Sequence, residues 1–394
     1  MKIESIDFFY LSMPKVTTEA DGSQDALLVR VAAGGLVGYG ECEAAPLPSI
    51  AALVCPLSHG SCQPVQDSVL GQKLKTSDDI QRISQIVAYQ SMDLLQAAHT
   101  YSGIEMALWD LLGKSLNEPV WKLLGYDHSS AKTPYFSVLF GDEPTMTLER
   151  AKEARQKGFQ AAKFGWGPIG TGTASEDREH FQAAREGLGN DGILLVDTGQ
   201  IFGDDVEKAS LRIKAMEEAN VLWFEEPFHA HALQEYCELA KRSGKIKLAG
   251  GEGAHHPSMA KHLIDFGKVG YVQIDCGRIG GIGPAKLVAD HAVAGGVTYV
   301  NHTFTSHLAL SASLQPYAGL KNHEICEYPG KPKSLALDIT KTHLEPDKNG
   351  QVRAPETPGL GIDINVEELT KYLVYVSIVV NGKQIFHTPS FSLQ

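Results

Sequence analysis

Residues 193–197 read ILLVD, a short apolar run that ends in a carboxylate. The same arrangement recurs downstream, as VLWFEE at residues 221–226 and as YVQID at residues 271–275. Short, continuous apolar runs of this kind are typical of strands that are buried on both faces, as in a parallel sheet. These stretches therefore predict a parallel sheet whose strands end in ionisable side chains.

Eight such runs follow one another, separated by stretches in which apolar residues have helical spacing. The runs are 135–138, 159–164, 193–196, 221–224, 246–249, 271–274, 297–300 and 325–326, and the expected helices include 178–188, 206–219 and 284–294. Strands that alternate with helices predict a (β/α)8 barrel. The alternative is a doubly wound open sheet, which usually has a GxGxxG turn after its first strand, and we find no such turn in that context.

The chain before the barrel has a different pattern. Residues 3–10 and 27–31 predict strands, glycines 34, 35, 38 and 40 predict a turn between elements, and residues 101–114 predict a helix with one packed face. Two stretches that contain Pro, Ser and Gly, residues 17–24 and 44–63, predict long loops. This part of the chain is expected to be an α+β domain.

These patterns divide the chain into three parts. We expect an α+β capping domain over residues 1–128 and a modified TIM-like barrel over residues 129–330. The remaining segment, residues 331–394, is too short to be a domain, and we expect it to pack back on the capping domain.

Composition excludes several classes of function. The 394 residues carry a formal net charge of −12, which gives no basic surface for nucleic acid or an anionic membrane. No apolar run is long enough to span a bilayer, and the N-terminus lacks the pattern of a signal peptide. The six cysteines form no CxxC pair, so we expect reduced, packing thiols. We expect a cytoplasmic homo-oligomer that acts on a small molecule.

Nearly every run of the barrel ends in an ionisable residue. The set is Lys163, Asp197, Glu225, Glu252, Asp275, His302 and Glu327. One carboxylate after a strand is usually a helix cap or a solvated turn residue. Six successive strands that behave alike indicate an active site, because strand C-termini converge on one face of a barrel.

Three of these carboxylates, Asp197, Glu225 and Glu252, come from successive strands. Their mutual repulsion favours a bound cation. Oxygen ligands suit Mg²⁺, with Mn²⁺ as a substitute. The pair Glu225-Glu226 leaves the second ligand ambiguous by one residue, and we choose Glu225 because only one of two adjacent strand residues points inward.

Asp275 and His302 end adjacent strands. A carboxylate that accepts a hydrogen bond from one imidazole nitrogen fixes the tautomer and raises the basicity of the other nitrogen. The pair is therefore predicted to be a catalytic dyad.

Together these motifs resemble the mandelate racemase subgroup of the enolase superfamily. The resemblance rests on LLVDTGQ with Asp197, WFEEP with Glu225, AGGE with Glu252, QIDCGRIGGI with Asp275 and YVNH with His302, and on GYGE at 38–41, IEMALWDLLGK at 104–114 and PGLGI at 358–362. Sites of this superfamily pair a Lys or His base with magnesium. The resemblance implies that Mg²⁺ binds the three carboxylates and a substrate carboxylate, that His302 removes the α-proton, and that Glu327 hydrogen-bonds the enediolate.

The resemblance also implies which loops and side chains contact the substrate. The stretches 17–24 and 44–63 match the two capping-domain loops that close over the site. Just beyond the strand ends, Trp166, Gln200 and His255 are candidates for substrate contacts, together with Lys163 and Glu327.

One departure from the family pattern bears on the reaction. The family often has Lys-x-Lys at the end of the second strand, whereas AAKFGW has Lys163 followed by Gly165. Lys163 either holds the substrate carboxylate or acts as a base, and a glycine cannot act as a second base. We therefore expect a lyase, a dehydratase of an aldonate or aldarate that forms a 2-keto-3-deoxy acid.

Three alternatives remain. A racemase or epimerase would need a second acid/base opposite His302. Muconate-type cycloisomerases resemble this sequence but have Lys where Asp275 stands. A non-catalytic barrel that binds a small molecule would be expected to lose part of the metal and dyad set, and all of it is present.

Overall fold

Eight parallel strands form one barrel sheet in the computed structural model, which describes residues 1–392. Their order is β10-β9-β8-β7-β6-β5-β4-β11, so the first barrel strand pairs with the last. The strands are β4 (Thr133–Leu139), β5 (Ala161–Gly165), β6 (Ile193–Asp197), β7 (Val221–Glu225), β8 (Lys247–Gly250), β9 (Tyr271–Asp275), β10 (Thr298–His302) and β11 (Ile325–Pro329). All eight predicted strands are confirmed, and the pairing of β4 with β11 rules out the open sheet.

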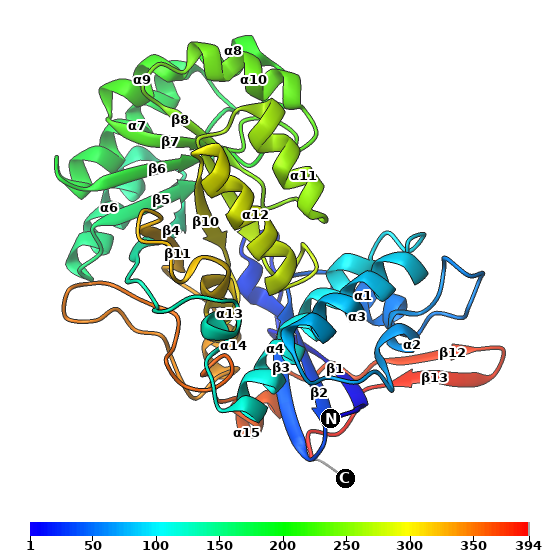
Figure 1. The fold of residues 1–394 in the computed structure, drawn as a ribbon. Helices are drawn as coiled ribbons and strands as arrows, with labels where there is room; N and C mark the ends of the chain where they lie inside the picture. Colours follow the sequence, from blue (N-terminus) through cyan, green and yellow to red (C-terminus); the bar gives the residue numbers. More distant parts are fainter. Residues whose placement is uncertain (393–394) are drawn as a thin grey trace.

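Helices pack outside this sheet and connect its strands (Figure 1). They are α6 (Pro144–Gln156), α7 (Ala174–Leu188), α8 (Val206–Ser210), α9 (Ile213–Glu218), α10 (Leu233–Arg242), α11 (Pro257–His262), α12 (Ile282–Gly295) and α13 (His307–Leu314). The predictions at 178–188 and 284–294 are confirmed, whereas the single helix predicted at 206–219 is two short helices, α8 and α9.

The barrel interior has a hydrophobic floor. It is built from Tyr135, Ala161, Leu195, Trp223, Ala249, Val300 and Ile325. Side chains alternate along a strand, so residues two positions further on point to the same side. Ala161, Leu195, Trp223, Val300 and Ile325 are each followed two positions later by Lys163, Asp197, Glu225, His302 and Glu327, in that order. Strand periodicity therefore places these five ionisable groups directly above the floor.

The barrel closes between β10 and β11 through a side chain. The Asn301 Nδ2 donates to the carbonyl of Glu327 at 3.3 Å, and Asn301 Oδ1 accepts from the Glu327 backbone N–H at 2.9 Å. The hydroxyl of Tyr317 donates to the same Oδ1 at 2.9 Å. One buried amide thus joins the strand that carries His302 to the strand that carries Glu327.

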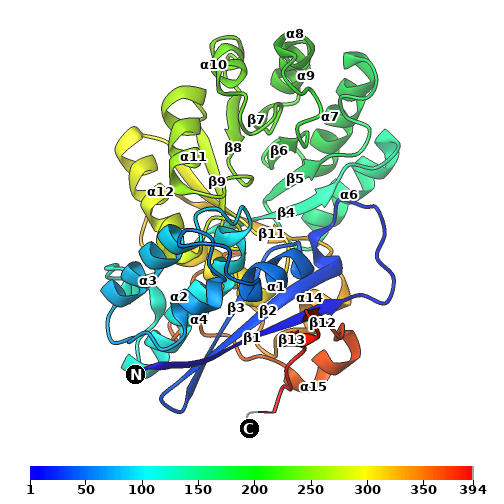
Figure 2. The same ribbon diagram turned by 90° about the vertical axis from the view of Figure 1, so that its right-hand side faces the viewer.

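The capping domain is a three-stranded antiparallel sheet covered by helices (Figure 2). Its elements are β1 (Ile3–Ser12), a 3-10 turn (Gly22–Gln24), β2 (Asp25–Ala33), β3 (Leu36–Cys42), α1 (Pro46–Val54), α2 (Val65–Val69), α3 (Ser77–Gln90), α4 (Ala97–Leu116) and α5 (Val120–Leu123). The predicted α+β class is confirmed.

Two details of the capping domain were predicted wrongly. Gly34 and Gly35 form the turn, but Gly38 and Gly40 lie within β3. A Cβ at Gly38 or Gly40 would lie 2.1 Å from a backbone oxygen of α4, so these glycines allow the helix to pack directly on the strand. The stretch 44–63 was predicted as an irregular loop, but it contains helix α1, which has Pro in its first turn.

The C-terminal segment returns to the capping domain. It contains α14 (Ser334–Asp338), α15 (Val366–Leu369), β12 (Ser377–Val380) and β13 (Lys383–His387). The N–H of Val374 donates to the carbonyl of Tyr10 at 2.8 Å. The ring of Phe391 stacks on Phe9 with centroids 4.3 Å apart. These contacts attach the end of the described chain to β1.

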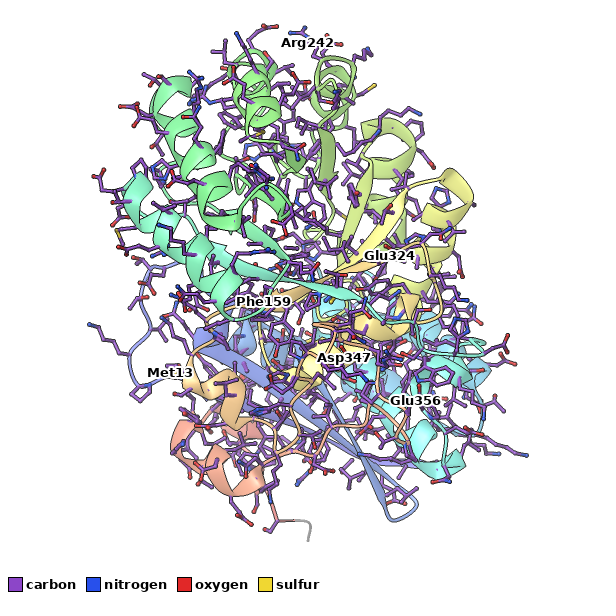
Figure 3. All side chains as sticks on the ribbon, turned by 90° about the vertical axis from the view of Figure 1, so that its left-hand side faces the viewer. Met13, Phe159, Arg242, Glu324, Asp347 and Glu356 are labelled. Atoms are coloured by element: carbon purple, nitrogen blue, oxygen red, sulfur yellow. The ribbon has the colours of Figure 1, made fainter. Side chains whose placement is uncertain are left out.

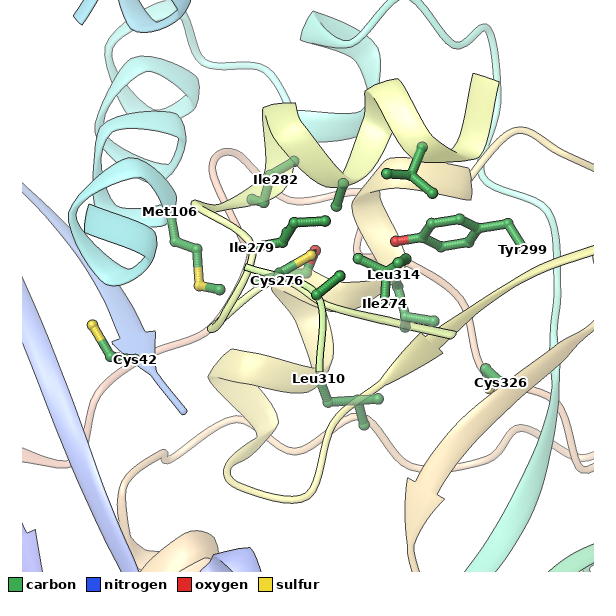
Figure 4. Close-up of a cluster of buried hydrophobic side chains, with 14 of the residues drawn as sticks. Cys42, Met106, Ile274, Cys276, Ile279, Ile282, Tyr299, Leu310, Leu314 and Cys326 are labelled. Carbon is green, nitrogen blue, oxygen red and sulfur yellow. The ribbon is translucent and has the colours of Figure 1, made fainter. Parts of the chain in front are cut away.

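The hydrophobic core continues from barrel to capping domain. Figure 4 shows Met106 of α4 and Cys42 of β3 on the capping side of a cluster that includes Cys276, Ile279 and Ile282. All six cysteines are free, and three of them are buried. Among the described residues, no helix has the length and apolar character needed to cross a bilayer.

Candidate active site

A cavity of about 360 Å³ lies where the C-terminal ends of the barrel strands face the capping domain. The barrel wall of the cavity includes Lys163, Trp166, Asp197, Glu252, Arg278 and His302, and the capping wall includes Asp21, Gly22, Asp25, Glu43 and Ala44. Of the two predicted loops, the first contributes Ala20, Asp21 and Gly22 to the lining, and the second contributes Ala44.

Lys163 is the central cation of the barrel wall. Its Nζ lies 2.7 Å from Glu225 Oε1, 3.0 Å from Glu327 Oε1 and 3.7 Å from Asp197 Oδ2. Burial alone would lower the pKa of Lys163, but the adjacent carboxylates of Glu225 and Glu327 outweigh it and raise the pKa well above its usual value. The side chain is therefore held as an ammonium ion.

The carboxylates around Lys163 are buried and close to one another. Burial raises the pKa of Asp197 to about 7, with Lys163 opposing the shift and Glu252 adding to it. Burial also raises the pKa of Glu225 to about 8, against the effect of Lys163. A group of ionised carboxylates in this space thus needs more positive charge than Lys163 alone supplies.

His302 and Asp275 form the predicted pair. His302 Nδ1 lies 2.6 Å from Asp275 Oδ2, and His302 Nε2 lies 3.1 Å from Glu252 Oε2. Asp275 is itself fixed, because its Oδ1 accepts the Gly277 N–H at 2.6 Å. Burial would lower the pKa of His302, but Glu252, Glu327 and Asp275 outweigh it and raise the pKa to about 10. The carboxylates thus hold the imidazole in one orientation, with Nε2 on the Glu252 side, and favour its charged form.

Arg278 joins the two walls of the cavity. Its Nε lies 2.6 Å from Glu43 Oε2 of the capping domain, and its Nη1 lies 3.2 Å from Glu252 Oε1 of the barrel. Burial would raise the pKa of Glu252, but His302 and Arg278 outweigh it and lower the pKa to about 2. Arg278 thereby couples the position of the capping domain to an expected metal ligand.

Glu225 and Glu226 occupy different environments. Glu225 accepts hydrogen bonds from Lys163 Nζ at 2.7 Å and from Trp223 Nε1 at 3.0 Å, both inside the barrel. Glu226 has a positive φ of 40°, and its Oε2 accepts from Gln200 Nε2 at 3.2 Å. Glu225 was chosen as a metal ligand because it was expected to point into the barrel, and it does so.

Asp197, Glu225 and Glu252 supply carboxylate oxygens, the donors that a hard divalent cation prefers, although among the described residues these oxygens do not all lie within 4.8 Å of one another. Asp197 and Glu252 line the cavity and Glu225 lies beneath it; Asp197 and Glu225 end the neighbouring strands β6 and β7, and Glu252 follows the end of β8. The raised pKa values of Asp197 and Glu225 arise from burial and mutual repulsion, which a cation would relieve. Both oxygens of Glu252 face cations, His302 on one side and Arg278 on the other.

Glu327 is held as an acceptor below the cavity. Its Oε1 accepts from Ser137 Oγ at 2.9 Å and from Lys163 Nζ at 3.0 Å, and its Oε2 accepts from the Thr303 N–H at 2.9 Å. Its Oε2 also lies 3.9 Å from His302 Nε2. In this structure Glu327 therefore supports Lys163 and His302 from beneath and does not line the cavity.

Three of the five residues proposed for substrate contact lie just beyond strand ends, and they have different positions. Trp166 lines the cavity with 46% of its surface exposed, and its ring packs so closely on Gly199 that a Cβ there would lie 2.6 Å from it. Gln200 instead bonds Glu226, and its Oε1 lies 3.4 Å from His229 Nδ1. His255 lies beside His99, with ring centroids 5.9 Å apart. The cavity lining thus includes Trp166 but neither Gln200 nor His255.

Sequence reasoning missed the residues of the capping wall and Arg278. Arg278 stands three residues after Asp275 in QIDCGRIGGI, and Glu43 stands two residues after Glu41 in the strand that begins at Leu36. Alternation along that strand was the available signal for Glu43. Asp21 lies within the predicted loop 17–24 and Asp25 lies directly after it, where no periodic pattern marks individual side chains.

A second group of possible metal ligands lies elsewhere. His307, His343 and Glu345 offer atoms within 4.8 Å of one another. His307 and Glu345 border a cavity of about 850 Å³ between the C-terminal segment and the barrel, whose lining includes Phe159 and Asp347, labelled in Figure 3.

The geometry of this group does not suit a metal. His307 Nδ1 accepts the Leu344 N–H at 3.1 Å, so the neutral ring carries its proton on Nε2. The ring of His343 stacks on that of His307 with centroids 4.5 Å apart and planes 16° apart. Ring nitrogens bind metals within the plane of the ring, and two stacked rings do not direct their lone pairs to one point. This cluster therefore carries no metal assignment.

Comparisons with known proteins agree with the fold and the site geometry. Residues 146–369 match the family model described as Enolase C-terminal domain-like, and residues 11–125 match the Mandelate racemase / muconate lactonizing enzyme, N-terminal domain. The chain belongs to the enolase superfamily. Within that superfamily it falls in the mandelate racemase/muconate lactonizing enzyme group, as the sequence motifs predicted.

Solved and curated members of the superfamily resemble the chain over most of its length. A structure described as a predicted mandelate racemase from Rhodobacter sphaeroides is 63% identical, covers 99% of this chain and 100% of its own, and has a TM-score of 0.96. The D-galactarolactone cycloisomerase of Agrobacterium fabrum is 28% identical over 86% of this chain and 88% of its own. The D-galactonate dehydratase of Klebsiella pneumoniae is 27% identical over 85% and 87%.

Proposed function

We propose that this enolase-superfamily protein is a magnesium-dependent dehydratase of a sugar acid that forms a 2-keto-3-deoxy acid. The observation that carries the proposal is the His302–Asp275 pair on one side of the cavity, with Gly165 at the position of a second lysine. A Cβ at Gly165 would lie 3.1 Å from Asp197 Oδ2, so this position faces the acidic cluster. Elimination needs one base, whereas racemisation needs two.

The steps follow from the residues of this chain. Lys163, held as an ammonium ion, would bind the substrate carboxylate and offset the negative charge that develops on it when the α-proton leaves. His302 would remove that proton through Nε2, while Asp275 holds the ring and stabilises the imidazolium. The protonated His302 would then give the proton to the β-hydroxyl as the Cβ–O bond breaks. Water leaves, and the enol product becomes the 2-keto acid.

Asp197, Glu225 and Glu252 would hold the divalent cation, Mg²⁺ by their donor chemistry and Mn²⁺ as a substitute. When bound, the cation would supply positive charge to the carboxylate oxygens of the substrate. The relatives with dehydratase and cycloisomerase activity support a reaction of this class on sugar acids.

A second candidate is the same proton abstraction followed by opening of a ring. Trp166 favours it, because an exposed aromatic face on the cavity wall suits the C–H face of a cyclic sugar derivative. His302 would remove the α-proton, the bond from Cβ to the ring oxygen would break, and that oxygen would take the proton. The curated D-galactarolactone cycloisomerase is consistent with this alternative.

The test uses the purified protein with Mg²⁺ and a panel of aldonic acids, aldaric acids and sugar lactones. Semicarbazide detects 2-keto product from the open-chain acids, and nuclear magnetic resonance detects ring opening. We expect product that requires both the metal and His302, so that chelation or His302→Asn abolishes it. α-Proton exchange into deuterium oxide without elimination would instead identify an isomerase.

A further inference from the structure

The charges on the barrel wall of the cavity are balanced. Lys163 is paired with Glu225 and Glu327, Arg278 with Glu43 and Glu252, and His302 with Asp275. Within residues 1–392, these three are the cationic side chains that line the cavity, and each has a carboxylate within 3.2 Å. A substrate carboxylate next to the reacting carbon would therefore interact with the positive charges of this wall.

The capping wall carries three carboxylates, and one of them, Asp25, has no matching cation among residues 1–392. Glu43 is paired with Arg278, and Asp21 Oδ2 lies 3.4 Å from Lys333 Nζ. Asp25 also lines the cavity, at the first position of β2, yet its carboxylate has no hydrogen bond or ion pair with any residue in the described chain. Burial and then the carboxylate of Glu43 raise the pKa of Asp25, since both disfavour its charged form.

A free carboxylate on a cavity wall accepts hydrogen bonds from hydroxyl groups and repels anions. A neutral, hydroxyl-bearing group next to Asp25 would supply the partners that the carboxylate lacks. A second substrate carboxylate in the same place would meet Asp25 with Glu43 behind it, and like charges placed together in this way are disfavoured strongly.

We propose that Asp25 makes the site selective for sugar acids with one carboxylate, whose far end carries hydroxyl groups, over dicarboxylic sugar acids. The proposal rests on the sugar-acid activity proposed above and narrows its substrate class from aldonates or aldarates to monocarboxylates. Asp25 is a specificity residue here and takes no part in proton transfer.

The test compares acids that differ in one group. D-Galactonate and galactarate share their configuration at C2 to C5 and differ at C6, which is a hydroxymethyl group in one and a carboxylate in the other. D-Gluconate and D-glucarate form a second such pair. We expect kcat/KM in the presence of Mg²⁺ to favour the aldonate of the preferred pair by a factor on the order of 100. Asp25→Asn should reduce that preference at least tenfold, mainly by raising activity on the aldarate.

Asp142→Asn is the matched control, because it removes one negative charge from an exposed position outside the cavity. It should leave the preference unchanged. Asp25→Ser is a second variant that removes the charge with a smaller side chain. Equal or better use of the aldarate by the wild type, or a preference unaffected by both Asp25 variants, would overturn the proposal.

Failure of the proposed function gives a different result. If no acid is turned over, thermal stabilisation by each acid in the presence of Mg²⁺ still reports which one binds. Stabilisation by the aldonate alone, with the aldarate gaining in Asp25→Asn, would support the selectivity while the dehydratase activity fails. Stabilisation by both acids alike, or by neither, would overturn the selectivity as well.

Discussion

The two walls of the cavity are built on different principles. On the barrel wall, Lys163 and His302 are each surrounded by carboxylates, and their side chains come from fixed positions on strands β5 and β10. On the capping wall, Asp25 faces the cavity from the point where a loop enters β2, and no residue of the described part of the chain is its partner. Arg278 is the side chain that joins the two walls.

From this difference we infer that the barrel wall would carry out proton transfer, whereas the capping wall would determine which substrate binds. A network in which every charge is paired holds its groups in fixed geometry, as proton abstraction requires. An unpaired side chain on a cavity wall remains free to form hydrogen bonds with the ligand. A substitution of that side chain therefore alters which ligand binds. The variants below test this division, beginning with the largest expected effect.

Lys163→Met removes the central cation of the barrel wall. Without it, Glu225 and Glu327 lose a buried ion pair, and we expect the free energy of unfolding at pH 8 to fall by about 3 kcal/mol. We also expect kcat/KM for the best substrate to fall on the order of 10³-fold. Chemical denaturation and steady-state kinetics measure the two effects. The control, Lys157→Met, breaks an exposed pair with Glu153 and should cost less than about 1 kcal/mol. Equal effects would mean that the buried network has no special role.

The stability of the metal-free protein should fall as the pH rises from 5 to 9. Asp197 and Glu225 have pKa values raised to about 7 and about 8, so they keep protons in the folded state that the unfolded chain has already lost. The pKa of His302 is raised to about 10, so its stabilising charge is also lost as the pH rises. Glu252, with a pKa lowered to about 2, changes only in more acidic solution. We expect a decrease of about 2–4 kcal/mol over this range.

Thermal unfolding in the presence of a chelator measures this decrease. Added Mg²⁺ should stabilise the protein more at pH 8 than at pH 5, because its ligands must lose their protons to bind. A metal-free protein that becomes more stable toward pH 9 would contradict the assignment of raised pKa values to this wall.

Arg278 and Glu43 should be coupled across the two walls. In a double-mutant cycle with Arg278→Met and Glu43→Gln, we expect a coupling energy of about 1–3 kcal/mol in the free energy of unfolding. Because Arg278 also contacts Glu252, Arg278→Met alone should weaken Mg²⁺ binding. Additive effects of the two substitutions would show that the walls are independent.

Substitutions at or beyond the edge of the cavity should have the smallest effects on the kinetic parameters. Trp166→Ala removes an aromatic group from the lining, and we expect a rise in KM of about 10-fold with little change in kcat. His255→Ala should change neither parameter more than about twofold, since His255 lies outside the lining. A large effect at His255 would mean that the substrate extends beyond the cavity described.

The sequence predicted the barrel wall better than the capping wall, for physical reasons. Lys163, Asp197 and His302 stand two residues after floor residues on regular strands, so strand periodicity alone determines their direction. Asp25 and Arg278 do not follow a floor residue on a regular barrel strand, and their positions depend on how the capping domain packs on the barrel. Gly38 and Gly40 were mispredicted for a similar reason. They lie within a strand because α4 packs closely against them, and this contact is visible only in the folded structure.

The side-chain closure at Asn301 has a consequence for how the barrel fluctuates. A strand pair joined through side chains, such as those of Asn301 and Glu327, lacks the cooperative backbone ladder that protects amides elsewhere in the sheet. In native-state hydrogen exchange, the amides along this join should open with a lower free energy than those of β5 and β6. The barrel would then open first between the strands that bear His302 and Glu327, so that the least protected part of the sheet includes the proposed base.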